Sequence, residues 1–403
     1  MISYMDNSRL TRRAFAGAAA GAAIQRAAGA NSRLNIGLIG TGNRMRDHFS
    51  EMAKLHASEN FAVTAICDVY RPNREAAAAR VEKEYGAKPR TTTRYQELLT
   101  WKDVDAVVIA TPDFSHPIIL EAAVKAGKDV YVEKPFATDL ALARSAYQAV
   151  KATDRIVQVG SQRRSDPGFI ACAKQIKSGI LGKITRIDID NHFQEPRWRR
   201  DFHMIQAADI DWEAFQMGRI TKPFDARLFR EWQLFEETTN GIPGLWMSHF
   251  IDLVAWYLDD PYPRGAVSNG GVYLWQDGRN TSDVFHSLLD YKDCLVSFAM
   301  SLTNASTPRN LWYGVKGTLD ANALKISGAG SRDPRRITEE IAIEKEKGIE
   351  SHFHNWINCI RSRKEPRAPV QAGFSHAVAG VLSSEALRLQ RRVTFNAQTL
   401  QIG

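Results

Sequence analysis

Short apolar runs alternate with amphipathic stretches through the first part of the chain. Residues 34–40 are mostly apolar, and at 44–55 the apolar positions are spaced to share one helical face. The same order, strand then helix, recurs up to about residue 160. The predicted strands are 34–40, 61–67, 104–111, 129–133 and 156–160, and the main predicted helices are 44–55, 72–85 and 140–153. Such alternation predicts an α/β domain with a doubly wound parallel sheet, buried on both faces.

From residue 168 the pattern changes. Residues 184–193 alternate apolar and polar positions, which predicts a strand with one exposed face. Further strands are predicted at 266–275, 282–291, 295–303 and 311–315, with helices at 169–177, 351–363 and 374–391. This pattern predicts a C-terminal α+β domain with a large, mostly antiparallel sheet that is open on one face. We therefore predict two domains, residues 31–155 and 156–403.

Composition agrees with two domains of ordinary size. The 403 residues are 44% hydrophobic and 24% charged, as in typical soluble globular proteins. The net charge of +8 is spread out without a run of five basic residues, so we expect no nucleic-acid partner. The basic clusters at 197–200 and 391–392 are interpreted as solvated faces or anion contacts. The four cysteines lie far apart and form no C-x-x-C, so no metal site is predicted and a disulfide is left open.

The first thirty residues are predicted to lie outside the fold. Arg12 and Arg13 precede a mildly apolar stretch at 14–24, and Ala28-Gly29-Ala30 supplies small residues for cleavage. This arrangement resembles a twin-arginine export signal and predicts a periplasmic protein. The alternative is a leader of a cytoplasmic protein. The stretch is too short to span a bilayer, so we expect no stable membrane insertion.

Two glycines follow the first predicted strand and open the first predicted helix. Gly40 allows a tight turn, and Gly42 allows backbone N–H groups at the helix N-terminus to approach a diphosphate. Asp68 ends the second strand, where a carboxylate accepts hydrogen bonds from ribose hydroxyls and repels a 2′-phosphate. These residues predict a Rossmann domain that binds NAD. Arg71 keeps NADP as the alternative, and the third glycine of the fingerprint is replaced by Met45.

Three motifs give the chain a specific resemblance. GTGNR at 40–44, TPDFSH at 111–116 and AGKDVYVEKP at 126–135 resemble the Gfo/Idh/MocA family, which includes glucose–fructose oxidoreductase and inositol dehydrogenase. The resemblance covers nearly the whole chain after the N-terminal segment. It implies that the last helix packs back on the first domain and that a cis peptide bond precedes Pro135. The expected cofactor-binding residues are Gly40, Thr41, Gly42, Asn43, Arg44, Asp68, Thr111, Pro112, His116, Glu133, Lys134 and Gln162.

The same resemblance implies a catalytic pair. It places Lys134 between nicotinamide and substrate, where an ammonium group stabilises the charge on a hydroxyl oxygen that loses its proton. In the family a helix carries D-x-x-x-H, whose histidine accepts that proton. His249 matches the histidine, but Leu245 stands at the acidic position. Asp252, one turn after His249, is the predicted substitute for the missing acid, with a structural role as the alternative.

Aromatic and basic side chains are the candidates for substrate binding. Aromatic faces stack on sugar C–H groups, which makes the tryptophans of the second domain candidates. Packing roles are the alternative for each tryptophan, and an interdomain role is the alternative for Arg163. The predicted substrate-binding residues are Lys134, Arg163, Trp198, Trp246 and His249, with Trp232 nearby.

The leading hypothesis is an NAD(P)-dependent oxidoreductase that moves a hydride between nicotinamide and a hydroxyl-bearing carbon of a sugar, polyol or related compound. If the protein is exported, we expect a tightly bound cofactor. Two alternatives stay open: a redox-assisted glycoside hydrolase or lyase, and a non-catalytic sensor of nucleotides or sugars. We also predict a homo-oligomer, a dimer or tetramer, formed through the open sheet.

Overall fold

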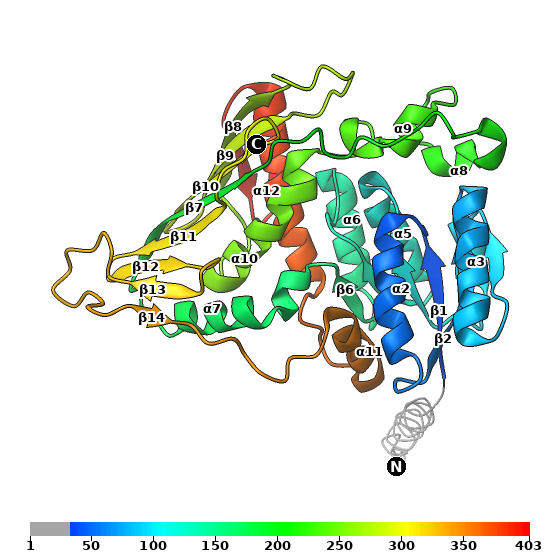
Figure 1. Cartoon of the computed structure of the whole chain (residues 1–403), viewed down its shortest axis with the longest axis horizontal. Coiled ribbons are helices and arrows are strands. Elements are labelled where there is room, and N and C mark those ends of the chain that lie inside the picture. Colours follow the sequence, from blue (N-terminus) through cyan, green and yellow to red (C-terminus); the bar gives the residue numbers. More distant parts are fainter. Residues whose placement is uncertain (1–32) are drawn as a thin grey trace, which may run out of the picture.

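The computed structural model describes residues 33–403 and contains two sheets with helices between and around them (Figure 1). The first sheet has six parallel strands in the order β3-β2-β1-β4-β5-β6. They are β1 (Leu34–Ile39), β2 (Phe61–Cys67), β3 (Arg90–Thr92), β4 (Ala106–Ile109), β5 (Asp129–Val132) and β6 (Val157–Val159). The predicted doubly wound parallel sheet is confirmed, and the short strand β3 was not predicted.

Helices cover both faces of this sheet because alternate strand residues point to opposite sides. The helices are α2 (Asn43–Leu55), α3 (Arg71–Tyr85), α4 (Tyr95–Thr100), α5 (His116–Lys125) and α6 (Leu140–Lys151). Leu38 and Val108 share a core with α2 and α3, whereas Ile109 and Val132 share a core with α5 and α6. Both layers are buried and apolar, which explains the unbroken apolar strand sequences.

The first domain also includes a helix from near the C-terminus. Helix α11 (His352–Ser362) contributes Phe353 and Trp356 to the same core as α2 and α3. Just after it, Arg363 donates to the buried carboxylate of Asp129 on β5. Both β6 and α11 therefore lie in the first domain, although they follow residue 155 in sequence.

The second sheet has ten strands in the order β14-β13-β12-β11-β7-β10-β9-β8-β15-β16. Its pairs are antiparallel except β7 with β10, which confirms the mostly antiparallel sheet. The strands are β7 (Ile184–His192), β8 (Gly265–Gly271), β9 (Val284–Asp290), β10 (Leu295–Ser301), β11 (Arg309–Gly314), β12 (Gly317–Asp320), β13 (Lys325–Ser327), β14 (Ile341–Ala342), β15 (Val393–Asn396) and β16 (Gln401–Ile402). The prediction of a strand up to Trp275 was wrong. The carboxylate of Asp283 accepts three consecutive backbone N–H groups, from Tyr273 to Trp275, and turns the chain there.

One face of the second sheet is covered and the other is open. Helices α7 (Pro167–Lys177), α10 (Ser248–Leu258) and α12 (Val370–Leu389) share the core with its inner side chains. On the outer face Val267 lies directly opposite Leu288, and both side chains are exposed, as is Leu295. The open face expected from the alternating pattern is therefore present.

Helix α12 joins the two domains. The ring of Phe374 stacks on Tyr147 of α6 with centroids 4.7 Å apart. Two residues further along, the ring nitrogen Nε2 of His376 accepts a hydrogen bond of 3.0 Å from the backbone N–H of Phe136. The last long helix thus packs against the first domain, as the resemblance implied. The four cysteines are buried and unpaired.

A long segment of the second domain lies across the carboxyl ends of the first sheet (Figure 1). It holds α8 (Trp212–Gln216), α9 (Ala226–Arg230) and a π-helical turn, Pro243–Met247. Two backbone hydrogen bonds fix it there: Asp211 N–H to Val69 O at 2.9 Å, and Phe114 N–H to Thr238 O at 3.2 Å. The edge at which parallel sheets bind ligands is therefore roofed by the other domain.

Candidate active site

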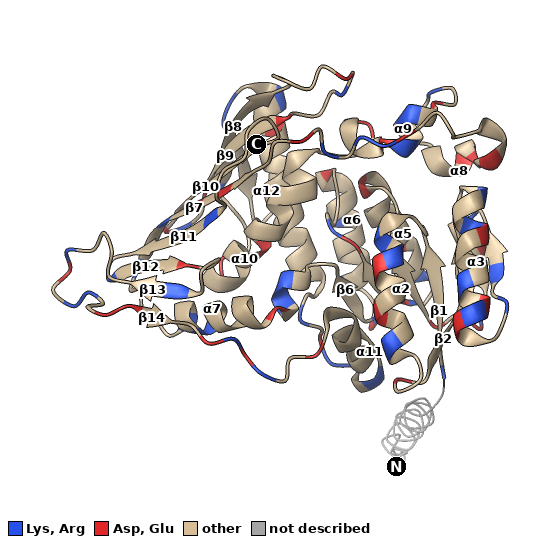
Figure 2. Cartoon of the chain, viewed as in Figure 1, with Lys and Arg blue, Asp and Glu red and all other residues tan. Residues whose placement is uncertain are grey.

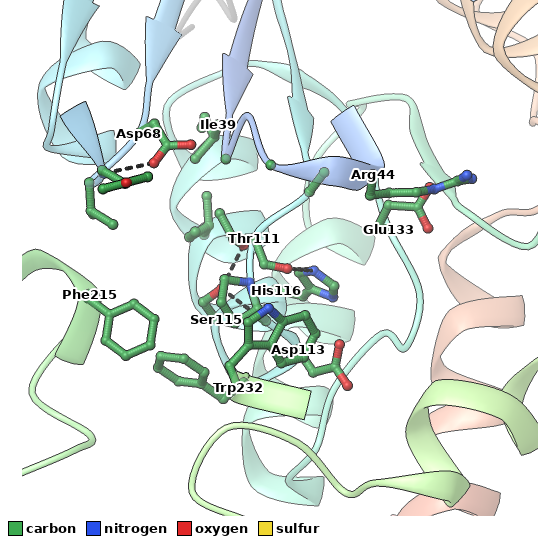
Figure 3. A pocket seen from close by; sticks show the side chains of 18 of the residues that line it. Ile39, Arg44, Asp68, Thr111, Asp113, Ser115, His116, Glu133, Phe215 and Trp232 are labelled. Atoms are coloured by element: carbon green, nitrogen blue, oxygen red, sulfur yellow. Dashed lines mark hydrogen bonds and ion pairs between the residues drawn. The ribbon is translucent and has the colours of Figure 1, made fainter. Parts of the chain in front are cut away.

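A cavity of about 430 Å³ lies between this edge and the roofing segment. Its floor is built from strand ends of the first sheet, and its far wall comes from residues 200–249 of the second domain. Figure 3 shows Asp68 on one side of the cavity and the pair Arg44 and Glu133 on the other. Eleven of the twelve predicted cofactor-binding residues line it: Gly40, Gly42, Asn43, Arg44, Asp68, Thr111, Pro112, His116, Glu133, Lys134 and Gln162.

The glycine turn has the geometry that a diphosphate needs. Gly40 has a φ of +79°, and a Cβ there would lie 2.7 Å from Cγ2 of Thr111. Gly42 is the N-cap of α2 and forms no side-chain cap, and a Cβ there would meet only Asn73, at 3.9 Å. The first N–H groups of α2 therefore face the cavity through an opening that a larger residue would fill, and this fits a bound dinucleotide.

Asp68 supports the turn from the end of β2. Its Oδ2 accepts hydrogen bonds from the backbone N–H of Thr41 at 2.6 Å and from the Thr41 hydroxyl at 2.8 Å. Thr41 therefore points toward Asp68 and is the predicted cofactor residue that does not line the cavity. Oδ1 accepts the N–H of Tyr70 at 2.8 Å. Arg71 forms an ion pair with Asp209, so its guanidinium is engaged outside the cavity.

Glu133 is the centre of a buried polar network at the end of β5. One carboxylate oxygen accepts from Arg44 Nε at 2.7 Å, from His48 Nε2 at 2.8 Å and from Gln162 Nε2 at 3.0 Å. Burial alone would raise the pKa of Glu133, but the hydrogen bonds and charges of His48 and Arg44 hold it well below its usual range. The adjacent Lys134 is therefore held beside a carboxylate that stays ionised.

Lys134 points across the cavity to the second domain. Its Nζ donates a hydrogen bond of 2.7 Å to the backbone oxygen of Leu245 in the π-helical turn. Burial lowers the pKa of Lys134, and the charges of Asp113 and Glu133 oppose this effect. The peptide bond between Lys134 and Pro135 is cis, as the resemblance implied. A carbonyl of the turn thus anchors the ammonium group at the position where an acid is expected in the family.

His249 lies one turn after Leu245 and lines the same cavity. Burial lowers the pKa of His249 well below its ordinary value, and the nearby cations Lys134 and Arg163 act in the same direction. The imidazole is therefore neutral at pH 7 and has a lone pair that can accept a proton. Within residues 33–403 its ring nitrogens form no hydrogen bond, so no carboxylate orients the ring.

The prediction that Asp252 replaces the missing acid is not supported by the geometry. Its carboxylate is 1% exposed, accepts from Arg164 Nε at 2.9 and 3.0 Å, and does not line the cavity. A buried carboxylate needs a cation partner, and Arg164 on the neighbouring segment supplies one. Arg163 does not line the cavity either, because its guanidinium stacks over the ring of Phe250 at 3.9 Å.

The tryptophan that lines the cavity is not one of the two that were predicted to bind substrate. Trp198 and Trp246 do not line the cavity, and the ring of Trp246 packs against Phe193 at 5.1 Å. Trp232 does line it, together with Phe215 (Figure 3). These rings come from the roofing segment, whose position depends on tertiary packing.

His116 ties the Thr111 loop to the Lys134 loop. Its two ring nitrogens lie 2.8 Å from the backbone oxygens of Thr111 and Pro135. Burial lowers its pKa. The side chain is therefore a brace that holds the two loops at a fixed separation, and it also lines the cavity.

Sequence reasoning missed one acidic residue of the site. Asp113 is 2% exposed, lines the cavity and accepts a hydrogen bond of 2.7 Å from the Thr239 hydroxyl. Burial raises its pKa to about 7, although the charge of Lys134 opposes the shift. Its place after a strand end, in the TPDFSH motif, was the available signal. Arg200, Arg230 and Phe215 were also missed, because they reach the cavity from loops without a regular pattern.

Comparison with known proteins assigns a fold type to the first domain. Residues 34–161 match the model of the GFO_IDH_MocA family, described as oxidoreductase family, NAD-binding Rossmann fold. Inositol 2-dehydrogenase of Paracoccus denitrificans is 35% identical over 144 residues, or 36% of this chain and 41% of that protein. Inositol 2-dehydrogenase of Rhizobium meliloti is 30% identical over 156 residues, or 39% of this chain and 44% of that protein. These matches cover less than half of each relative, and they identify residues 34–161 as an NAD-binding Rossmann domain.

Two solved structures share the fold over most of the chain. The WlbA dehydrogenase of Bordetella pertussis, in complex with NADH and UDP-GlcNAcA, aligns with a TM-score of 0.68 at 19% identity, covering 91% of this chain and 98% of that one. Levoglucosan dehydrogenase in complex with NADH aligns with a TM-score of 0.67 at 18% identity, covering 90% and 99%. At these identities the likeness shows that both domains have the same fold and arrangement.

Proposed function

We propose that the protein is an NAD-dependent oxidoreductase that acts on a CH–OH group of a sugar, polyol or related compound. One observation carries the proposal: Lys134 and His249, from different domains, line the same cavity as the glycine turn and Asp68. The bound cofactor would supply a nicotinamide carbon that accepts or donates a hydride. Gly42, Asp68 and the N-terminus of α2 would hold its diphosphate and ribose.

The protein groups supply the proton chemistry. His249 is neutral because it is buried beside cations, so it accepts the proton of the substrate hydroxyl. The ammonium of Lys134 stabilises the charge that develops on the same oxygen. Its anchor is the carbonyl of Leu245, and its charge is favoured by Asp113 and Glu133. The hydrogen bond and the neighbouring carboxylates of Lys134 thus compensate for the missing acid of the family pattern. With its lowered pKa, His249 is a weaker base than an ordinary histidine.

The test is an assay of NADH formation at 340 nm on a panel of polyols and sugars, with Lys134→Ala and a matched control. We expect Lys134→Ala to lower turnover by a factor of about 10² or more and to leave NADH binding within a few-fold of wild type. Lys125→Ala is the control, because Lys125 is 64% exposed at the end of α5 and outside the cavity. Turnover of Lys134→Ala within a few-fold of wild type would contradict the proposal.

The same assay separates the two catalytic hypotheses. An oxidoreductase forms one NADH for each substrate molecule oxidised. Release of an aryl group from an aryl glycoside, with NAD required but no net NADH formed, would instead indicate redox-assisted cleavage. Binding of NAD without any turnover on the panel would favour a sensor.

We further propose export by the twin-arginine pathway. The supporting motif, Arg12 and Arg13 before an Ala/Gly-rich stretch, lies outside the described residues. In residues 33–403 no helix has the length and apolarity needed to cross a bilayer. A fusion of residues 1–40 to a reporter that is active only in the periplasm tests this, with Arg12→Lys/Arg13→Lys as control. Reporter activity that is unchanged by the double substitution would contradict export by this pathway.

A homo-oligomer through the open sheet is also proposed. The exposed pair Val267 and Leu288 supports it, because apolar side chains that lie side by side on a solvent-facing sheet favour contact with another subunit. Light scattering should give a mass of two or four chains, and Leu288→Lys should reduce it. A wild-type monomer would refute this proposal.

A further inference from the structure

The charged side chains that line the cavity do not all have partners. Arg44 is paired with Glu133, and Lys134 faces the charge of Asp113. Two other cationic residues line the cavity, Arg200 and Arg230. Within the described chain, neither of their side chains forms an ion pair with a carboxylate. The cavity therefore holds two guanidinium groups that form no ion pair with a carboxylate of the described residues.

The fold holds these two arginines side by side. The backbone N–H of Arg200 donates to Oε1 of Glu231 at 2.8 Å, and Nε of Arg230 donates to the backbone oxygen of Asp201 at 3.2 Å. Residues 200–201 and residues 230–231 are thus joined by one hydrogen bond donated from each side. The charge of Glu231 offsets part of the charge of Arg200, but the ion pair of Glu231 is with Arg227, whose Nε donates to its other oxygen at 2.7 Å. Figure 2 shows basic residues on α9, above the carboxyl edge of the first sheet.

Such an arrangement is costly without a ligand. Burial lowers the pKa of Arg200, the neighbouring charge of Arg230 lowers it further, and the charge of Glu231 opposes both effects. A cation that is partly removed from water next to a like charge destabilises the fold unless an anion pairs with it. The guanidinium fork matches the geometry of carboxylate and phosphate groups. The chemistry of the two side chains therefore predicts an anionic ligand group.

The pair belongs to the second-domain wall of the cavity, whereas the glycine turn belongs to its floor. The glycine turn and Arg44 already face the diphosphate position from the first domain. The arginines belong to the roofing segment, which continues through Trp232 to Thr239, and Thr239 donates to Asp113, a neighbour of Lys134. The anion that they bind would thus share the second-domain wall of the cavity with His249.

We propose that Arg200 and Arg230 form an anion subsite for a carboxylate or phosphate group of the substrate. The substrate class is then a sugar acid or sugar phosphate, in preference to a neutral polyol. This inference rests on the proposed function, because it assigns a substrate to the same cavity.

The test is a calorimetric titration of the full chain saturated with NADH. The probes are D-glucuronate, D-glucose 6-phosphate and, as the neutral counterpart, D-glucose. We expect at least one of the two anions to bind the wild type about tenfold or more tighter than glucose does. Arg200→Gln and Arg230→Gln should each lose about ten- to hundredfold in that affinity and keep the NADH affinity. The matched control is Arg199→Gln, because Arg199 is next in sequence, 53% exposed and outside the cavity.

The outcomes separate the two proposals. If the wild type binds NADH but neither anion more tightly than glucose, the anion subsite is refuted, and the proposed function is not contradicted. If the arginine variants lose affinity for NADH or NADPH and not for the sugar anions, the pair serves the cofactor and the inference is wrong. If the wild type does not bind NADH at all, the proposed function fails first. A second readout is salt: anion affinity of the wild type should fall as ionic strength rises, while that of Arg200→Gln should fall less.

Discussion

Replacing Asp113 by asparagine tests the electrostatics of the site directly. The buried carboxyl has its pKa raised from 3.8 to about 7, mainly by burial. The folded chain therefore binds more protons than the unfolded chain between pH 4 and 7, so stability falls as pH rises through this window. Because one pKa unit equals about 1.4 kcal/mol, ionisation of Asp113 costs the folded state up to about 4 kcal/mol above pH 7.

Asp113→Asn removes this cost and keeps the shape of the side chain. The Asn oxygen can still accept the hydrogen bond from Thr239. We expect the variant to match wild type near pH 4 and to become more stable than wild type by up to about 4 kcal/mol at pH 8. Active-site carboxylates that reduce stability are a known form of the trade between stability and activity. Turnover of the variant should fall, because Lys134 loses a neighbouring negative charge.

The measurement is the free energy of unfolding from urea titrations at several pH values between 4 and 8. The control is Asp103→Asn, the same chemical change at a side chain that is 62% exposed and outside the cavity. If the stability curves of wild type and Asp113→Asn run parallel from pH 4 to 8, the carboxyl does not titrate in this window and the reasoning is refuted.

Three further substitutions test other parts of the site. Gly40→Ala should destabilise the protein by about 1–3 kcal/mol in thermal unfolding, because its φ of +79° is strained for alanine and the Cβ would lie 2.7 Å from Thr111; unchanged stability would contradict the strained turn. Gly42→Ala should keep the wild-type stability and lose NADH affinity in a fluorescence titration, because its Cβ would enter open space beside the diphosphate; unchanged affinity would argue against that binding position. Asp252→Asn should cost about 3 kcal/mol of stability by unpairing Arg164, with kcat of the remaining folded enzyme within a few-fold of wild type; a large loss of kcat without a loss of stability would restore a catalytic role.

The first sheet and its ligand edge were predictable from sequence for a simple reason. A strand that is buried on both faces must be apolar throughout, so its ends are marked by the first polar residues, such as Asp68 and Glu133. In a parallel sheet these ends meet at one edge. The positions of Gly40, Gly42 and Lys134 in the cavity follow from that rule. The ends of β8 were not predictable, because a single carboxylate, Asp283, ends the extended pattern locally.

Partners within the site could not be read from sequence. Asp252 is one helical turn from His249, yet its carboxylate binds Arg164 from another element. The Lys134 ammonium uses the carbonyl of Leu245, an interaction that the identity of residue 245 does not encode. Both pairings depend on how elements that are distant in sequence pack together, and spacing along one element gives no information about that.

The sequence by itself determined the alternation of elements, the parallel sheet and the strand-end residues, because local burial patterns and chain order fix these. Tertiary structure alone decided which charges are paired. The roofing segment has no regular period, and its place over the sheet results from packing against Val69, Phe114 and helix α12. That placement removes Asp113 from water and brings Arg200 and Arg230 together without a counter-ion. Desolvation depends on the three-dimensional surroundings of a group, so no linear pattern records it.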